Sequence, residues 1–176
     1  MKQQPVNDGK LHGLKLKYIL VGDSGPGLSS LRRRFLHNTF LPTTKSTPET
    51  FKCESSFIQL ENITIEARIW SFNSNKALKN ITRPYYIGFD IALLVYDITR
   101  RETFIEIQKE LKEIQKYEYN RYQDSRNHAR YMLIGNKCDL NNIRQVSTIE
   151  AEVFANENNM LFIETSAKTG EGVDVV

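Results

Sequence analysis

The chain has few cysteines, no long apolar run and almost no excess of charge of either sign. Its 176 residues include two cysteines, Cys53 and Cys138, too few for the disulfide framework of a small secreted domain, which predicts a cytoplasmic protein with free thiols. No apolar run approaches the ~20 residues of a membrane span. The net charge of +3 gives no argument for a nucleic-acid partner, and we expect none.

What remains is the length and composition of one folded domain. Hydrophobic residues make up 40% of the chain, enough for a core, and no linker rich in proline, glycine or serine divides residues 14–176. Residues 1–13 are polar and lack the apolar segment of a secretory signal. We therefore predict a flexible N-terminal arm over 1–13 and one domain over 14–176.

Short apolar runs alternate with longer amphipathic stretches, which predicts strands alternating with helices. The predicted strands are 16–21, 57–60, 63–70, 91–96, 131–134 and 161–163. Only Glu61 and Asn62 separate the second run from the third, a spacing typical of a β-hairpin. The last three runs are apolar throughout, as in strands buried on both faces. This order predicts an α/β fold: a doubly wound, mostly parallel six-stranded sheet with one antiparallel edge strand and helices on both faces.

Two helix starts are predicted where residues 99–102 and 147–150 match the capping box, in which a hydroxyl and a carboxylate bind free N–H groups. Val153 and Phe154 follow the second box and are predicted to face the core. Residues 117–130 show no clean periodicity and predict a polar, extended loop. The apolar residues that follow the first box at helical spacing are Phe104, Ile107, Leu111 and Ile114.

A glycine-rich segment, residues 22–29, follows the first predicted strand and leads into a predicted helix over 30–36. Its letters, GDSGPGLS, match both glycines and the final hydroxyl of the phosphate-binding pattern G-x-x-x-x-G-K-[ST]. In that pattern backbone N–H groups and the helix N-terminus attract phosphates. Two interpretations fit the segment: a phosphate-binding loop, or a tight turn between a strand and a helix.

The segment departs from the pattern at two positions. Leu28 stands where the pattern has lysine, and one contact charge pair is worth roughly 4 kcal/mol at an effective dielectric near 20, before desolvation. Pro26 has no backbone N–H to donate. Ser29 keeps the hydroxyl that can ligate Mg²⁺. We expect this loop to hold phosphates less tightly than an intact one.

Two polar loops follow the last two predicted strands, NKCD at 136–139 and ETSAK at 164–168. With these loops and the stretches LKYILVGDSGPG, RPYYIGFDIALLVYDITRRETF, MLIGNKCDL and FIETSAKTG, the chain resembles the Ras-like small GTPases and, among them, the Rab branch, from residue 14 to 176. The resemblance implies a P-loop GTPase fold, GTP or GDP and Mg²⁺ as ligands, and vesicle traffic as the process.

The resemblance also implies how guanine would be bound. Asp139 would accept hydrogen bonds from the N1–H and 2-amino groups of guanine, which adenine does not offer. Asn136 would orient the loop, and the Ala167 N–H would donate to the guanine O6. The stems of Lys137 and Lys168 would pack on the faces of the base. The implied nucleotide-binding residues are Ser24, Gly25, Pro26, Gly27, Leu28, Ser29, Ser30, Phe40, Asn136, Lys137, Asp139, Ser166, Ala167 and Lys168, with Phe40 as the stacking aromatic.

The second switch of the family is damaged in this sequence. Where the family has D-T-A-G-Q after a tryptophan, Trp70 leads into SFNSN. Ser71 replaces the aspartate that holds Mg²⁺ through water, and Ser74 replaces the glycine that meets the γ-phosphate. Asn75 replaces the glutamine that positions the attacking water, a step that carries much of the catalysis in phosphoryl transfer. No intact catalytic residue is expected, and hydrolysis is predicted to be slow or absent.

The sequence leaves open which residue of the first switch corresponds to the family's metal-binding threonine. Counting forward from the glycine-rich segment puts Thr47 at the family's Mg²⁺-binding threonine, so Ser29 and Thr47 are the expected metal ligands. Phe51 then lies one residue too early for the family motif, and Thr50 or Ser46 are alternatives to Thr47.

The resemblance also implies a partner surface of Phe51, Trp70 and Tyr85, which match the aromatic triad through which Rab proteins meet effectors and exchange factors. Packing in the core is an equally good interpretation of these aromatics.

The resemblance ends at residues 172–176, where the last helix of the family should be starting. We therefore expect most of that helix to be missing and apolar surface to be exposed. No cysteine motif for prenylation follows, so membrane attachment would need a segment that a longer form of the protein carries.

Three hypotheses for function follow. The preferred one is an atypical Rab-like protein that binds guanine nucleotide and hydrolyses GTP poorly or not at all. The second is a scaffold for protein partners that needs no nucleotide. The third is a competent GTPase with compensating cations, for which residues 32–34 and Lys76 are candidates, although helical geometry is expected to point most of residues 32–34 outward.

Overall fold

The computed structural model describes residues 14–22, 25, 27–42, 51–60, 63–73, 83–119 and 130–175. Six strands form one sheet in the order β2-β3-β1-β4-β5-β6, in which β2 runs antiparallel to β3 and every other neighbouring pair is parallel. The strands are β1 (Leu14–Gly22), β2 (Phe51–Leu60), β3 (Ile63–Asn73), β4 (Ile91–Asp97), β5 (Arg130–Asn136) and β6 (Leu161–Thr165). The predicted sheet is confirmed, including its antiparallel edge. The predicted arm over 1–13 lies outside the described residues.

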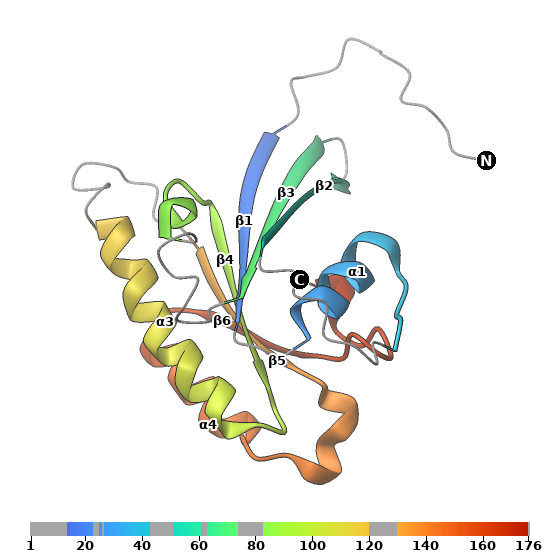
Figure 1. The fold of residues 1–176 in the computed structure, drawn as a ribbon, viewed down its shortest axis with the longest axis vertical. Helices are drawn as coiled ribbons and strands as arrows, with labels where there is room; N and C mark the ends of the chain where they lie inside the picture. Colours follow the sequence, from blue (N-terminus) through green and yellow to red (C-terminus); the bar gives the residue numbers. More distant parts are fainter. Residues whose placement is uncertain are drawn as a thin grey trace.

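The helices cover both faces of this sheet, as predicted (Figure 1). Helix α1 (Leu28–His37) lies on one face, and α3 (Arg101–Tyr119) and α4 (Thr148–Glu157) lie on the other. Short 3-10 segments η2 (Arg83–Tyr86), η3 (Cys138–Ile143) and η4 (Val173–Val175) join or follow these elements. None of the helices described is both long and apolar enough to cross a membrane.

Alternation along the central strands divides the core into two layers. In β1, Ile19 and Val21 pack with the layer under α3 and α4, whereas Tyr18 and Leu20 pack with the layer under α1. Successive side chains of a strand point to opposite faces, so a strand with helices on both sides must be apolar throughout. β4 meets this condition, because all its residues after Ile91 are buried.

β6 was expected to be buried in the same way, and this prediction is wrong. Leu161 is 63% exposed, and only Thr165 of this strand is fully buried. The reason is the position of β6 at the edge of the sheet, where fewer elements cover it.

The prediction of a capping box at 99–102 is wrong, and the one at 147–150 is confirmed in part. Helix α3 begins at Arg101, and the Thr99 hydroxyl and N–H both donate to the Asp97 carboxylate, so Thr99 does not cap the helix. Ser147 does cap α4, accepting a hydrogen bond from the Glu150 N–H at 3.1 Å. The Glu150 carboxylate binds Arg101 of α3 at 2.5 Å and so ties the two helices together.

The apolar face of α3 is confirmed, and that of α4 is shifted. All four residues predicted for α3 are buried, whereas in α4 the buried residues are Ala151 and Ala155 and Val153 is half exposed. Phe154 is partly buried against the core, with its ring centroid 5.6 Å from that of Phe104 in α3, so the prediction holds for Phe154 and is wrong for Val153.

The prediction of an extended loop over 117–130 is wrong at both ends. α3 continues to Tyr119 and β5 begins at Arg130, and the residues between them lie outside the described part of the chain.

Candidate functional site

The candidate site lies at the carboxyl edge of the parallel strands, where ligands bind in doubly wound sheets. β1 ends at Gly22, β4 at Asp97, β5 at Asn136 and β6 at Thr165. The register pairs Asn136 with both Asp97 and Thr165, so the loops that follow these three strands start side by side. The structure thus brings together the two loops that were predicted to bind the base.

Asn136 connects the two predicted base loops, residues 136–139 and 164–168, with the glycine-rich segment. Its Oδ1 accepts hydrogen bonds from the Ala167 N–H at 3.1 Å and from the Thr165 hydroxyl at 3.2 Å, and all three residues are buried. Its Nδ2 lies so close to Gly27 that a Cβ added there would be 2.8 Å away. The predicted orienting role of Asn136 therefore has a physical basis. The Ala167 N–H, assigned by resemblance to the guanine O6, has Asn136 as its partner in this structure.

Asp139 lies in η3 with its carboxylate held in place. The Ser166 hydroxyl donates to Asp139 Oδ1 at 2.7 Å, and the Lys168 ammonium lies 3.8 Å from Oδ2. The Ser166 oxygen also accepts the Thr169 N–H at 3.1 Å, which stabilises the turn. The Asp139 side chain is 13% exposed, and a carboxylate has about four lone-pair sites, so acceptor capacity remains for two donors of a ligand.

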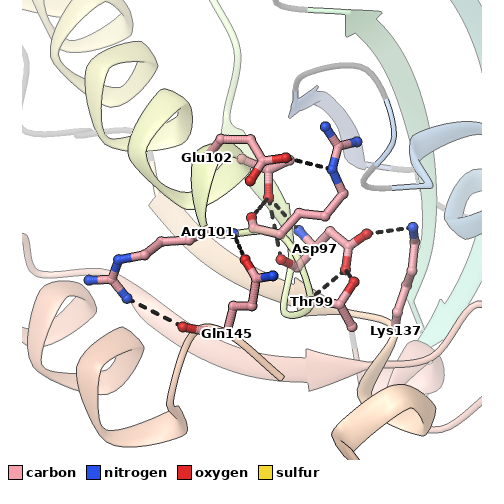
Figure 2. A network of polar contacts seen from close by, with 8 residues as sticks. Asp97, Thr99, Arg101, Glu102, Lys137 and Gln145 are labelled. Carbon is pink, nitrogen blue, oxygen red and sulfur yellow. Dashed lines mark hydrogen bonds and ion pairs between the residues drawn. The ribbon is translucent and has the colours of Figure 1, made fainter. Parts of the chain in front are cut away.

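Lys137 is oriented by a residue that sequence reasoning missed. Its ammonium pairs with Oδ2 of Asp97 at 2.5 Å, and Asp97 is fully buried at the end of β4 (Figure 2). Oδ1 of Asp97 accepts the Thr99 N–H and hydroxyl at 2.9 and 2.7 Å. The Lys137 side chain is 32% exposed beside Asp139, so its stem can pack on a flat ligand. The signal that the sequence offered for this residue is an aspartate at the end of an otherwise apolar strand.

The glycine-rich segment leads into α1 as predicted. Gly27 precedes the helix with a left-handed φ of 86°, its carbonyl accepts the Leu31 N–H at 2.8 Å, and among the described residues no cap hydrogen bond comes from the N-cap position. The N–H groups at this helix start can therefore receive an anion. Ser29 and Ser30 lie half-buried in the first turn, and the Leu28 side chain packs against the apolar layer under α1. Leu28 thus contributes packing where a lysine would supply charge.

Arg100 brings a cation to this segment, a contact that sequence reasoning missed. Gly25 has a φ of 106°, and a Cβ there would meet Nη1 of Arg100 at 2.2 Å. The Arg100 guanidinium also pairs with Glu102 at 2.8 Å. Glycine is required at position 25 both for its backbone conformation and for this close approach.

The arginines of α1 do not point mainly outward, which corrects the expectation for residues 32–34. Arg34 donates to the Ala167 carbonyl at 3.0 Å and to the Lys168 carbonyl at 2.8 Å, so it ties α1 to the second base loop. Arg32 is 5% exposed and faces β2 and β3, and only Arg33 is exposed to solvent. Helical periodicity identified the helix but not the polar groups that lie opposite it.

The third strand ends without a metal-binding carboxylate. Ser71 is buried, its hydroxyl accepts a hydrogen bond from the Arg32 guanidinium at 2.5 Å, and it donates to the Lys52 carbonyl at 3.4 Å. In the part of the chain that the structure describes, no three His, Cys, Asp or Glu side chains gather as metal ligands would. Of the two expected ligands, Ser29 is described and Thr47 is not.

Several predicted residues cannot be placed. Ser24, Pro26, Ser46, Thr47 and Thr50 lie outside the described residues. Ser74, Asn75 and Lys76 also lie outside them, so the proposed loss of the water-positioning group stays a prediction.

The aromatic residues of the predicted partner surface are placed in part. Trp70 and Tyr85 stack with ring centroids 5.3 Å apart, and both are partly buried against the core. The Lys17 ammonium lies 5.5 Å from the centroid of the Trp70 ring. Phe51 pairs with Phe72 in the hairpin, but its side chain is outside the described part. Phe40, the predicted stacking aromatic, packs against the layer under α1.

Cys138 lies between Lys137 and Asp139, and its thiol is expected to react slowly. Burial, Glu171 and other nearby acidic groups raise the pKa of its thiol to about 11. A raised pKa means that the protonated form, which is a poor nucleophile, prevails at neutral pH.

The strand order and the loops at its carboxyl edge define the class as a P-loop small GTPase fold. The model of the protein family described as "Ras family" matches residues 17–176 of this chain. The GTP-binding protein ypt3 of Schizosaccharomyces pombe is 42% identical over 158 residues, which cover 90% of this chain and 70% of the relative. The Ras-related protein Rab-2B of Dictyostelium discoideum is 40% identical over 158 residues, covering 90% and 74%. The chain belongs to the Ras family and to its Rab branch.

Proposed function

We propose that the chain binds guanine nucleotide and acts as a Rab-type regulator of vesicle trafficking. The observation that carries this proposal is the Asp139 carboxylate, held by Ser166 beside Asn136 and Lys137 at the edge of the sheet. One relative is named as a GTP-binding protein and the other as a Rab protein, which supports the same function.

Guanine fits this edge better than adenine for a chemical reason. An ionised carboxylate accepts hydrogen bonds only, so Asp139 favours a base that presents two adjacent donors. Guanine presents N1–H and a 2-amino group, whereas adenine presents an unprotonated ring nitrogen on that edge. An acceptor left unpaired in a partly buried pocket costs free energy. We therefore expect guanine to bind more tightly than adenine by on the order of 1–3 kcal/mol for each hydrogen-bond partner that adenine lacks.

The residues expected near the phosphates favour slow hydrolysis of GTP. Leu28 supplies no charge to the phosphates, and the serine at position 71 is engaged by Arg32. Asn75 is one methylene shorter than glutamine, and a misplacement of order 1 Å can cost about a hundredfold in rate. We therefore propose that exchange and partners, rather than turnover, determine which nucleotide is bound.

The first experiment identifies the ligand. Protein purified without added nucleotide is denatured, and the released material is separated by ion-exchange chromatography. We expect GDP or GTP, and titration calorimetry should give tighter binding of GDP than of ADP. Asp139→Ala should abolish this preference, while Asp174→Ala, at an exposed position, serves as the matched loss of one carboxylate. Equal affinity for GDP and ADP in the unchanged chain would contradict the proposal.

A scaffold that needs no nucleotide is the second candidate, favoured by Leu28 packing into the apolar layer under α1. A ligand that binds only the native state raises the unfolding midpoint by mass action. No shift of the midpoint with GDP or GTP, in the presence or absence of Mg²⁺, would therefore favour the scaffold over the nucleotide-binding protein.

A further inference from the structure

Arg144 and Glu164 form an ion pair beside the two predicted base loops. Arg144 follows the segment η3, and Glu164 lies in β6. Nη1 and Nη2 of Arg144 donate to Oε1 and Oε2 of Glu164 at 2.5 and 2.9 Å, so the contact consists of two charge-assisted hydrogen bonds. The two side chains are only 18% and 20% exposed, so water and salt screen this pair less than an ion pair on the open surface.

Each partner of this pair is fixed by further hydrogen bonds. Nε of Arg144 donates to Asn141 Oδ1 at 2.7 Å, and Nη1 also donates to the Val146 carbonyl at 3.1 Å. The Thr148 hydroxyl donates to Glu164 Oε1 at 3.2 Å. A guanidinium presents its donors in a planar fork, so it holds these acceptors in an arrangement that a lysine does not reproduce. The pair therefore sets the position of the segment after β5 relative to β6.

The pair also closes a ring that contains the carboxylate predicted to read the base. Asp139 lies in the first turn of η3, and Arg144 is the residue at the end of that segment. Glu164 precedes Ser166 by two residues, and the Ser166 hydroxyl donates to Asp139 Oδ1 at 2.7 Å. The first base loop is thus tied to the second both at Asp139 and at the end of η3. Loss of the ion pair leaves the position of Asp139 relative to the second loop less well defined.

The Arg101–Glu150 pair has the same two-bond form in a different place. Its hydrogen bonds are 2.9 and 2.5 Å long, and they join α3 to α4. Both of its members lie in helices, whereas Arg144 and Glu164 lie next to the predicted base loops. The chain therefore offers a matched comparison between an ion pair that ties helices and one that ties these loops.

We propose that Arg144 is a positioning residue for the guanine base: through Glu164 it keeps the loop of Asp139 and the loop of Ala167 at the spacing that a bound base requires. This inference rests on the proposed function, because it concerns the same base site. Arg144 acts through Glu164 rather than by contact with the nucleotide. When the pair is broken, the two loops separate more often and the nucleotide is released faster.

The test measures the release of a fluorescent GDP analogue from loaded protein after excess GDP is added. We expect Arg144→Met to release the analogue about tenfold faster, equivalent to 1.4 kcal/mol, because it removes both hydrogen bonds to Glu164. Arg144→Lys keeps the charge without the fork, so its release rate should lie between those of Arg144→Met and the unchanged chain.

Glu150→Met is the matched control for loss of an ion pair. It removes the pair between the helices and leaves the contact of Arg101 with the Gln145 carbonyl at 3.3 Å (Figure 2). We expect the release rate to change by less than about twofold, because this more exposed pair lies outside the base loops.

A second measurement distinguishes positioning of the base from general stability. IDP keeps the ring N–H of guanine and lacks its 2-amino group, so the ratio of the IDP to the GDP dissociation constant reports how well the Asp139 carboxylate faces the base. We expect this ratio to fall about threefold or more in Arg144→Met and to stay unchanged in Glu150→Met. Thermal unfolding measures the stability of each variant, and Arg144→Lys serves the same comparison if Arg144→Met does not fold.

The two members of the pair should act as one unit. Glu164→Met should speed release about as much as Arg144→Met does, and the double variant should be no faster than either, because no intact pair is left for the second substitution to break. Rates that multiply in the double variant would show that the two residues act independently, which overturns the proposal.

The outcomes separate this inference from the proposed function. Release within about twofold of the unchanged chain in the folded Arg144 variants overturns the positioning role and leaves guanine binding intact. The positioning role is also overturned if Glu150→Met speeds release as much as Arg144→Met, or if the ratio for IDP and GDP does not change. Failure of the unchanged chain to bind the analogue overturns the proposed function and this inference with it. Faster release with a lower ratio in Arg144→Met, and neither in Glu150→Met, supports both.

Discussion

The ammonium of Lys137 lies 2.5 Å from the carboxylate of Asp97, a residue with no exposed surface at the end of β4. This ion pair joins the loop after β5 to the end of β4 and sets the direction of a side chain expected to cover the base (Figure 2). Thr99 supplies two further hydrogen bonds to the same carboxylate. The site is thus organised by a buried charge that lies outside both predicted base loops.

The two members of this pair should respond differently to substitution. Lys137→Met leaves a buried carboxylate without its cation and should cost about 3 kcal/mol of unfolding free energy. Asp97→Asn keeps the shape and leaves Lys137 able to reach water, so its cost should be nearer 1 kcal/mol. Urea unfolding of both variants and of the double variant gives the coupling energy. Costs that add within about 0.5 kcal/mol would show that the pair contributes no interaction.

Gly27 and Gly170 make a matched pair for testing the link between the phosphate segment and Asn136. Both have a positive φ, of 86° and 95°, so alanine strains the backbone at each by about 1–2 kcal/mol. A Cβ at Gly27 would also press on Nδ2 of Asn136 at 2.8 Å, whereas one at Gly170 would make ordinary contact with Arg34 at 3.8 Å. We expect both alanine variants to lose stability and only Gly27→Ala to lose guanine-nucleotide affinity. Similar affinity losses in calorimetric titrations of the two variants would contradict this.

Arg34 should act as a positioning residue for the second base loop. Arg34→Met removes the hydrogen bonds to the Ala167 and Lys168 carbonyls and keeps the packing of the stem. We expect faster hydrogen exchange of the Ala167 N–H and several-fold weaker GDP binding. Arg33→Met, on the exposed side of the same helix, is the control. If Arg34→Met binds weakly while exchange at Ala167 stays slow, the loop is not held by Arg34.

The two thiols should differ in reactivity. Burial and Glu171 raise the pKa of Cys138 to about 11, so its thiolate is scarce at neutral pH. Below this pKa, the thiolate fraction rises about tenfold for each unit by which the pH is raised. Burial also raises the pKa of Cys53, but this thiol is exposed. Alkylation followed by peptide mass spectrometry should modify Cys53 first at pH 7 and Cys138 only as the pH approaches 10. Faster labelling of Cys138 at pH 7 would be inconsistent with this environment.

Much of the fold was predictable because it depends on local pattern. Uniformly apolar runs identified β4 and the inner part of β1, and the two-residue gap at 61–62 identified the hairpin whose strands pair from Leu60 and Ile63. The Ser147 cap was correct because its hydroxyl binds a group three residues away. These features require only contacts between near neighbours in the chain.

Other predictions failed where a group that the local pattern did not include took over the side chain concerned. Thr99 has the letters of a helix cap, but Asp97 at the end of a buried strand accepts its hydroxyl and N–H. The carboxylate of Glu150 binds Arg101, 49 residues away, in place of its own helix start. Val153 is apolar, which predicts a core residue, yet Ala151 and Ala155 are the buried residues of α4.

The letters at 136–139 and 164–168 were sufficient to locate the candidate base site, because parallel strands bring their following loops to one edge. No such rule says which polar group a helix will meet on the sheet below it. The burial of Arg32 against Glu54 and Ser71, the reach of Arg34 to the Ala167 carbonyl and the approach of Arg100 to Gly25 were decided only when α1, β2, β3 and the loop after β4 packed together. Each of these contacts joins residues far apart in the chain, and their geometry follows from packing rather than from periodicity.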